Sequence, residues 1–313
     1  MKLSSAVSSY ISVKSAQGHG FKAEDIILKS FGKAVGDIPL ASVQPEEVLA
    51  FLNGDGRVTG WWAKKYGVLS RFYRFALARG WTSRSPLPRG IPKPTAPAFV
   101  PYIYSHAELK RLLDAAPFVC SGRRAVDARV LKALLLLLYG AGLRLGEALA
   151  LSLRDVDLQH ACLDIRQTKF FKHRLVPMGA DLTRAMREYL LERNGIYAVT
   201  PDSPFFCRRN GSALTQAIAR SAFQQLRVVA RIERKGGCRR QPRLHDLRHT
   251  AAVHRVIAWY RNGVDLAERL PKLATYLGHG DLSATQRYLT MTPELLHEAC
   301  LRFERYAREG NHE

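Results

Sequence analysis

Apolar side chains recur at every third or fourth position along most of this chain, which is the spacing of helices packed on one side. The pattern predicts helices over residues 105–116, 179–195 and 212–232. Ser105 and Glu108 have the spacing of a capping box at the start of the first of these helices. The period is clearest after residue 60, where the apolar positions are Trp62, Tyr66, Leu69, Tyr73 and Ala76.

One short region has a different pattern. The segments ACLDIRQ (residues 161–167) and RLVPM (residues 174–178) are strand-like, and the basic segment TKFFKH between them predicts the turn of a β-hairpin. No alternation of strands and helices surrounds it, so a parallel sheet is not expected. The pattern therefore predicts a mainly α-helical fold with a small antiparallel β-sheet.

A proline-rich segment interrupts the helical pattern over residues 85–103. It holds six prolines between two helical regions, which is typical of an extended linker. We therefore expect a helical N-terminal domain over residues 1–84 and a C-terminal domain over residues 104–313.

The composition adds a strong charge to this picture. The chain has 313 residues, of which 48 are Lys or Arg and 27 are Asp or Glu, which gives a net charge of +21. Because 47% of the residues are hydrophobic, the charge belongs to a folded protein and indicates a polyanionic partner, most simply nucleic acid. The cysteines have neither disulfide nor zinc-site spacing: Cys120, Cys162, Cys207, Cys238 and Cys300.

The apolar run over residues 130–143 raises two other possibilities. At about 14 residues it is too short to cross a membrane, so it predicts a buried helix in a soluble, cytoplasmic protein. The glycines in and just after it, Gly140, Gly142 and Gly146, do not have dinucleotide-site spacing, and Arg144 stands where close backbone approach to a pyrophosphate would be needed.

Two basic segments are candidates for contact with DNA phosphates. The helix after residue 60 has a basic outer side made of Lys64, Lys65, Arg71 and Arg74. The segment over residues 231–243 includes Arg239 and Arg240 and precedes a histidine-rich helix. A solvated charged face and a mobile loop are the alternative interpretations of these two segments.

Five polar residues stand at the edges of apolar elements: Arg144, His245, Arg248, His279 and Tyr288. Each has an ordinary explanation, such as a core ion pair for Arg144, a helix cap for His245 or a surface charge for Arg248. Their order along the chain is harder to explain in this way.

Three segments carry a resemblance to a known family. GAGLRLGEALALSLRDVD (residues 140–157), HDLRHTAA (245–252) and LGHGDLSATQRYL (277–289) resemble, in order, the catalytic boxes of the tyrosine recombinases, or phage integrases. The resemblance extends over residues 104–289. It implies a two-domain DNA clamp, with a helical core-binding domain and an integrase-type catalytic domain.

The resemblance also implies roles for residues. The two arginines, the two histidines and the nucleophile of the family correspond to Arg144, Arg248, His245, His279 and Tyr288. Lys169 matches the lysine of the family's hairpin turn, and Lys172 is its rival. The implied partner is double-stranded DNA, on which the protein forms a homotetramer or assembles with related recombinases. Members of the family exchange C-terminal segments between subunits. In the tail over residues 293–313, an apolar stripe is expected to dock on a neighbouring subunit, with docking on its own domain as the alternative: Leu295, Leu296, Ala299, Phe303 and Tyr306.

The chemistry of phosphodiester cleavage suits these residue types. Two always-charged guanidiniums stabilise charge on the nonbridging oxygens, so neither a metal nor a cofactor is expected. A tyrosine with a reference pKa of about 10 needs a base or a positive field, which His245 or the arginines would supply. Lys169 would protonate the leaving 5′ oxygen. The phosphotyrosyl bond conserves energy, so strands can be resealed without ATP.

We therefore expect a site-specific recombinase that acts through a 3′-phosphotyrosyl intermediate. The stretch between Arg248 and His279 is about eight residues longer than in the Xer recombinases, which favours a mobile-element enzyme for integration, excision or transposition. A type IB topoisomerase and a catalytically silent DNA-binding protein are the alternatives. A carboxylate and magnesium transposase lacks support, because no acidic triad stands out.

Overall fold

The computed structural model describes residues 1–17, 21–54, 60–90, 100–120, 126–166, 173–235, 241–278, 295–301 and 304. The described residues fall into two compact units, one formed by residues up to 90 and the other by residues from 100 onward.

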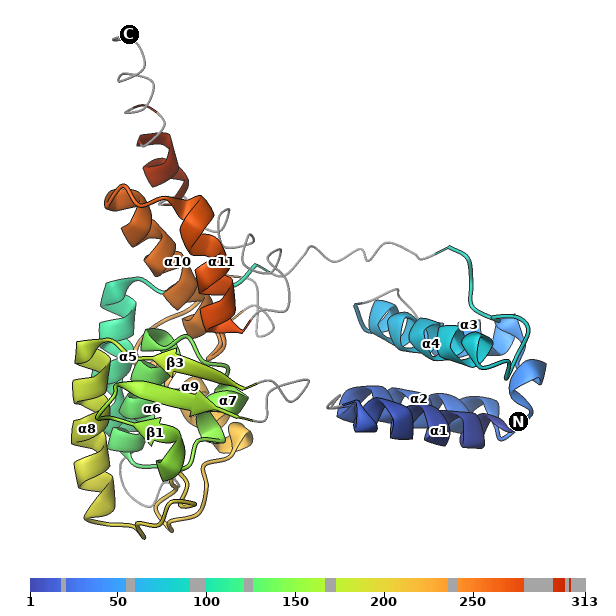
Figure 1. Ribbon diagram of the computed structural model, residues 1–313, viewed down its shortest axis with the longest axis horizontal. Coiled ribbons are helices and arrows are strands. Elements are labelled where there is room, and N and C mark those ends of the chain that lie inside the picture. Colours follow the sequence, from blue (N-terminus) through green and yellow to red (C-terminus); the bar gives the residue numbers. More distant parts are fainter. Residues whose placement is uncertain are drawn as a thin grey trace. The chain divides into compact units, whose positions relative to one another are not determined.

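The regular elements in the described part of the first unit are helices (Figure 1). Its elements are α1 (Leu3–Ala16), α2 (Lys22–Val35), the 3-10 turn Leu40–Ser42, α3 (Pro45–Asn53) and α4 (Gly60–Ala78). The predicted apolar face of α4 is confirmed, because Trp62, Leu69 and Tyr73 are buried among the other helices. Trp62 also donates a hydrogen bond from Nε1 to Asn53 Oδ1 at 3.0 Å, which ties α4 to α3.

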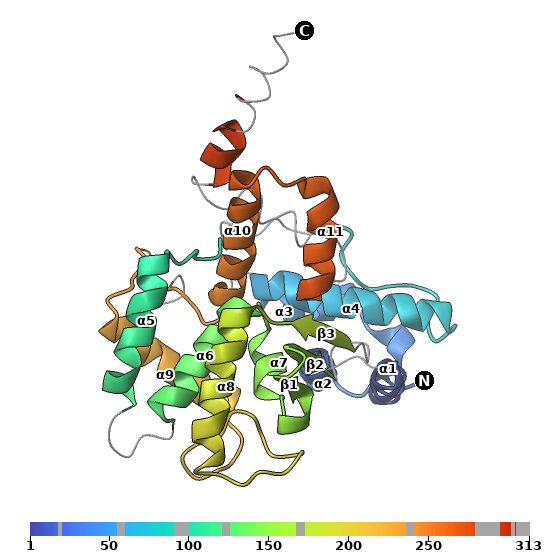
Figure 2. The same cartoon turned by 60° about the vertical axis from the view of Figure 1, so that its left-hand side comes forward.

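The second unit combines helices with a small sheet (Figures 1 and 2). Its helices are α5 (His106–Val119), α6 (Ala128–Gly140), α7 (Leu145–Leu149), α8 (Ala180–Asn194), α9 (Gln216–Val229), α10 (Asp246–Arg261) and α11 (Leu266–Leu277), with a 3-10 turn over Leu153–Asp155. Its strands are β1 (Val156–Asp157), β2 (Cys162–Ile165) and β3 (Arg174–Pro177). The mainly helical fold class is therefore confirmed.

Helix α6 forms the centre of the second unit and packs against α5, α8 and α10. Leu131, Leu134 and Leu137 have no exposed surface, and each buried leucine contributes about 1.5–3 kcal/mol. The predicted buried helix is thus confirmed. Among the described residues, no helix has the length and apolar character needed to cross a membrane. Because α6 is held on three sides, the loop after Gly140 starts from a fixed point.

The sheet has the order β1-β2-β3, and both pairs of strands are antiparallel. Leu163 pairs with Val176, and both are buried against the core, while Ile165 pairs with Arg174 at the far end of the ladder. The strands of the predicted hairpin are confirmed. Residues 167–172, which include the predicted turn except His173, lie outside the described residues.

Helices α10 and α11 lie side by side and enclose a separate small core (Figure 2). Leu295, in the helical segment over residues 295–301, is 1% exposed and belongs to this core. The side chain of Leu295 is thus buried in its own unit, which for this one residue of the C-terminal apolar stripe supports docking on its own domain. Leu296 is 51% exposed.

Candidate active site

Arg144 stands at the start of α7, directly after the loop that leaves α6. Its Nη1 donates to Glu147 Oε1 at 2.7 Å, and its Nη2 donates to the Gly278 carbonyl at 2.8 Å. Its backbone N–H also donates to Glu147 Oε2 at 3.0 Å. The side chain remains 41% exposed, so the guanidinium is anchored while part of it faces solvent.

Arg248 approaches the same place from the first turns of α10. Its side chain is 3% exposed, and Nη1 donates to the Gly142 carbonyl at 2.8 Å. Nη2 donates to the Leu277 carbonyl. The sequence separates Arg144 and Arg248 by a hundred residues, and the fold brings both guanidiniums to the junction of α7 and the end of α11.

Glu147 is the acidic centre of this junction. Arg174 contacts it with both terminal nitrogens, at 3.1 Å and 2.7 Å, and Arg248 Nη1 lies 4.0 Å from Oε2. Burial by itself raises the pKa of Glu147, but hydrogen bonds from Arg174 and Arg144 outweigh it and lower the pKa to about 2. Glu147 is therefore ionised at neutral pH. We call Arg144, Arg174, Arg248 and Glu147 the arginine cluster.

Glu147 and Arg174 were not among the residues expected from the sequence. Glu147 occupies the third position of a helix that starts after Arg144, and this capping-box position was a signal that could have identified it. No comparable signal marked Arg174, because an arginine in a short strand is ordinary until its partner is known.

Three successive carbonyls at the end of α11 accept from the cluster. Arg174 Nε donates to the Tyr276 carbonyl at 3.3 Å, and Arg248 and Arg144 donate to the next two carbonyls, of Leu277 and Gly278. These are the carbonyl groups that a helix leaves without internal partners at its C-terminus. The cluster therefore fixes the point from which the chain continues toward His279.

His245 is the residue before α10, and its ring lies in an edge-to-face contact with His249, with ring centroids 5.0 Å apart. The pKa of His245 is lowered, first by partial removal of the ring from water and then by the positive charge of Arg248. His245 is thus neutral at neutral pH and able to accept a proton.

Arg144 and His245 line one pocket of about 1160 Å³. Gln216, Arg220 and Arg243 line it as well, so its polar wall carries several cationic groups. A cleft of this size and charge can admit a phosphodiester next to the exposed part of Arg144.

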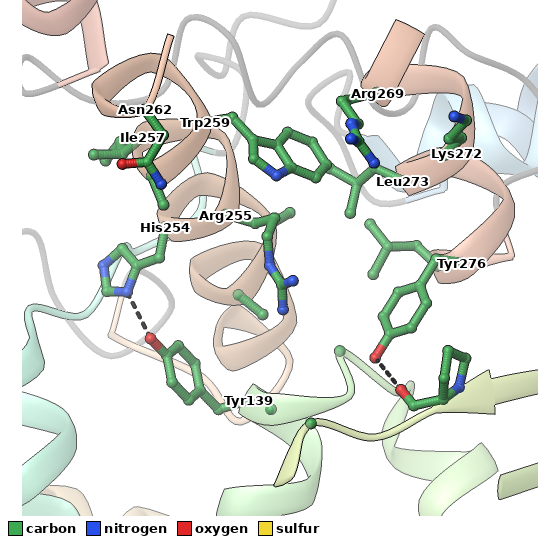
Figure 3. A pocket seen from close by; sticks show the side chains of 18 of the residues that line it. Tyr139, His254, Arg255, Ile257, Trp259, Asn262, Arg269, Lys272, Leu273 and Tyr276 are labelled. Atoms are coloured by element: carbon green, nitrogen blue, oxygen red, sulfur yellow. Dashed lines mark hydrogen bonds between the residues drawn. The ribbon is translucent and has the colours of Figure 1, made fainter. Parts of the chain in front are cut away.

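A second pocket, of about 810 Å³, lies between α10 and α11 (Figure 3). Tyr139 from α6 and His254 from α10 meet in it through a hydrogen bond of 2.9 Å. Tyr276 projects from α11 and donates from its hydroxyl to the Pro177 carbonyl at 3.2 Å. Burial raises the pKa of Tyr276, which makes this hydroxyl a poor nucleophile.

Four of the expected catalytic residues and rivals lie outside the described residues, namely Lys169, Lys172, His279 and Tyr288. Arg239 and Arg240 lie outside them too. Of the expected catalytic set, the structure therefore brings together Arg144 and Arg248, with His245 lining the same pocket as Arg144.

The expected basic face of α4 needs one correction. Lys64, Arg71 and Arg74 are exposed, as expected for an outer side. Lys65 is buried instead, with Nζ donating to the Phe51 carbonyl and lying 4.7 Å from the centre of the Phe51 ring. Its ammonium turns inward because the helix period places it on the α3 side.

The sequence matches known proteins over most of its length. Residues 104–294 match the profile of the phage integrase family. The integrase/recombinase y4rB of Sinorhizobium fredii is 35% identical over 308 residues, which cover 96% of each chain. The tyrosine recombinase XerD of Caulobacter vibrioides is 30% identical over 237 residues, which cover 75% of this chain and 72% of the relative.

Solved structures show the same fold at lower identity. The integrase of transposon Tn1549, in complex with a circular intermediate DNA, has a TM-score of 0.71 at 16% identity and covers 97% of this chain and 99% of its own. A lambda integrase dimer bound to a core site has a TM-score of 0.66 at 18% identity, covering 94% and 97%. A lambda integrase tetramer was solved on a Holliday junction. The chain belongs to the phage integrase family and is a tyrosine-type site-specific recombinase, an enzyme that cuts and rejoins DNA.

Proposed function

We propose that the protein cuts double-stranded DNA through a covalent 3′-phosphotyrosyl intermediate, with Tyr288 as the nucleophile. The observation that carries this proposal is the convergence of Arg144 and Arg248 on Glu147 and on the end of α11. That convergence places two guanidiniums together, next to the segment that leads to His279 and Tyr288.

In the proposed reaction, the phenol oxygen of Tyr288 attacks the phosphorus and its proton passes to His245. The guanidiniums of Arg144 and Arg248 hold the nonbridging oxygens, with each charge-assisted hydrogen bond contributing about 1.5–3 kcal/mol. The bond from phosphorus to the 5′ oxygen breaks, and Lys169, or its rival Lys172, gives that oxygen a proton. His279 adds a further hydrogen bond to the phosphate. Resealing runs the same steps in reverse with a new 5′ hydroxyl.

The two units have separate roles in this proposal. Residues 1–84 form the core-binding domain, whose exposed Lys64, Arg71 and Arg74 contact DNA phosphates. Residues 104–313 form the catalytic domain, and residues 85–103 are the linker between them. The loop with Arg239 and Arg240 grips the phosphate backbone near the cleavage site. The buried Lys65 supports α4 rather than touching DNA.

The assembled form is proposed to be a homotetramer on DNA, since recombination exchanges four strands. The reaction is proposed to serve integration, excision or transposition of a mobile element. The length of the stretch between Arg248 and His279 and the similarity to an integrase/recombinase support this setting.

The nucleophile is tested with a nicked DNA substrate that traps the covalent adduct. Tyr288→Phe should abolish the adduct and leave DNA affinity near the wild-type value, because only the attacking oxygen is lost. Tyr276→Phe is the matched control and should still form the adduct, since its hydroxyl is bonded to the Pro177 carbonyl. An adduct that survives in Tyr288→Phe and disappears in Tyr276→Phe would overturn the assignment.

A further inference from the structure

Arg174 makes a two-pronged contact with Glu147 in the arginine cluster. Nη1 donates to Oε1 at 3.1 Å and Nη2 to Oε2 at 2.7 Å, which is the parallel geometry that a guanidinium forms with a carboxylate and a lysine does not. The side chains are 14% and 10% exposed, so water competes little for this contact. The pair is therefore a largely buried ion pair that links β3 firmly to α7, and not a surface ion pair.

The end of α11 leaves Arg174 no room to move. Its Nε donates to the Tyr276 carbonyl at 3.3 Å, and a Cβ on Gly278 would lie 2.9 Å from Nη1. Gly278 also has a φ of +68°, a conformation that glycine adopts without strain. The side chain is thus enclosed between α7 and α11.

The position of Arg174 in the chain gives this ion pair a second function. It is the first residue of β3 and pairs with Ile165, the last residue of β2. This is the end of the ladder at which the chain passes from β2 to β3. Lys169 and Lys172 lie in the sequence between Ile165 and Arg174. Only His173 separates Lys172 from Arg174. Because Glu147 holds the side chain of Arg174, the start of β3 is fixed relative to α7.

We propose that Arg174 is a positioning residue for proton delivery: by joining β3 to Glu147, it sets the place of the hairpin lysine relative to the phosphate held by Arg144. This rests on the proposed function, in which a lysine ammonium protonates the 5′ oxygen as the phosphorus–oxygen bond breaks. Arg174 touches none of the reacting atoms in this step and acts through the backbone of the hairpin.

The test compares two nicked substrates that differ in the leaving atom, a 5′ oxygen or a 5′ sulfur. A thiolate, with a thiol pKa of about 8.5, leaves without a proton, whereas an alkoxide needs one. In the full-length protein, Arg174→Met should slow adduct formation at least about tenfold on the oxygen substrate, because general acid catalysis contributes on the order of 10²–10⁴-fold. On the sulfur substrate the rate should stay within about threefold of wild type, since no proton is needed.

The matched control is Arg166→Met. Arg166 directly follows Ile165, the residue of β2 that pairs with Arg174. Arg166 pairs with Asp164 and Asp155 and not with Glu147, so its loss should leave the ratio of the two rates unchanged. Arg174→Lys keeps the positive charge but not the two-pronged contact. It should shift the ratio in the same direction as Arg174→Met, and it serves as the test if the Met variant does not fold.

The outcomes separate this proposal from the function on which it rests. If Arg174→Met and Arg174→Lys slow adduct formation equally on both substrates, Arg174 only holds the arginine cluster together and the inference is overturned. The proposed function still stands in that case, provided that Lys169→Ala or Lys172→Ala forms the adduct at a near wild-type rate on the sulfur substrate. If neither lysine variant recovers there, the lysine is not the acid, and the proposed function fails together with the inference.

Discussion

At the scale of single residues, the histidines that begin α10 lie in a field of positive charge. The pKa of His249 is lowered to about 4, first by burial and then by the nearby His245. The pKa of His245 is lowered from 6.5 by partial burial and by Arg248, whereas Asp246 raises it. A ring held neutral in this way keeps an acceptor nitrogen available well below the pH at which an ordinary histidine is protonated.

This shift predicts how the rate of cleavage depends on pH. Because the pKa of His245 in the folded protein is below 6.5, the midpoint of the acidic decline in the rate of adduct formation should lie below pH 6.5. Single-turnover rates between pH 5 and 8 check this, and His245→Gln should lose the acidic decline. An acidic limb with a midpoint at or above 6.5 in the wild type would contradict the expectation.

The same two histidines affect stability with a defined sign. Their pKa values are lower in the folded chain than in the unfolded chain, so the unfolded chain binds more protons below pH 6.5. Well above that pH both rings are neutral in both states and the shift has no effect, whereas the free energy of unfolding decreases as the pH falls from 6.5 toward 4.

The sequence was sufficient to predict some of the residues of the candidate site. It was not sufficient to predict their hydrogen-bond partners. Arg144 and Arg248 stood out because each interrupts or follows an apolar run. Arg174 did not, because its importance depends on Glu147 and on the carbonyl of Tyr276, which the sequence places far away. Lys65 shows the opposite error: its spacing suggested an outer face, but the neighbouring α3 covers it.

At the scale of elements, the sequence predicts a helix boundary well where the stabilising hydrogen bonds are made by residues close together in the chain. The Ser105 cap of α5 is one case: Ser105 Oγ accepts from the Glu108 N–H at 3.2 Å, and Glu108 accepts from the Ser105 N–H at 2.8 Å. Helix α11 is a counterexample, because Pro271 lies inside it. It continues past the proline since Leu273 and Leu277 are buried in the core shared with α10.

The loop between α6 and α7 depends on Gly142. This residue has a φ of +60°, and a Cβ there would lie 2.8 Å from Leu277 Cδ2. Its carbonyl accepts from Arg248, so a shift of the loop also disturbs the arginine.

We therefore expect Gly142→Ala to lower the free energy of unfolding by about 2–4 kcal/mol, from backbone strain and overpacking together. Gly263→Ala is the control, because Gly263 has a φ of +67° with nothing within 4 Å, so only the strain of about 1–2 kcal/mol applies. Denaturant unfolding of both variants gives the comparison. Equal losses would show that Leu277 moves aside without cost.

At the scale of the whole molecule, the C-terminal segment is the part of the chain that we expect to link copies on DNA. Leu295 packs in its own unit, and Arg261 Nε pairs with Glu298 at 2.7 Å, so the beginning of the segment belongs to the chain that carries it. Any exchange between subunits must therefore begin after these contacts. The residues beyond Glu304 are the part proposed to reach a neighbour.

A chain that ends after Glu304 should test this proposal without opening the core around Leu295. Binding to a single DNA site should stay near wild type, while the complex that pairs two sites should weaken at least about tenfold, about 1.4 kcal/mol, because the exchanged contact is lost. Native gels and light scattering with DNA measure both. Normal pairing by the shortened chain would limit the segment to its own unit.

The contacts of the arginine cluster also determine at which step its side chains become ordered. Long cationic side chains lose rotational entropy of about 2 kcal/mol each when they are immobilised. Here Glu147 and the three carbonyls of α11 immobilise the guanidiniums before any phosphate arrives, so this entropy is lost during folding and not during the encounter with DNA. Arg174 and Arg248 therefore lose little further conformational entropy when a target site binds. Discrimination between target sites then depends on parts of the protein that become ordered only on binding DNA.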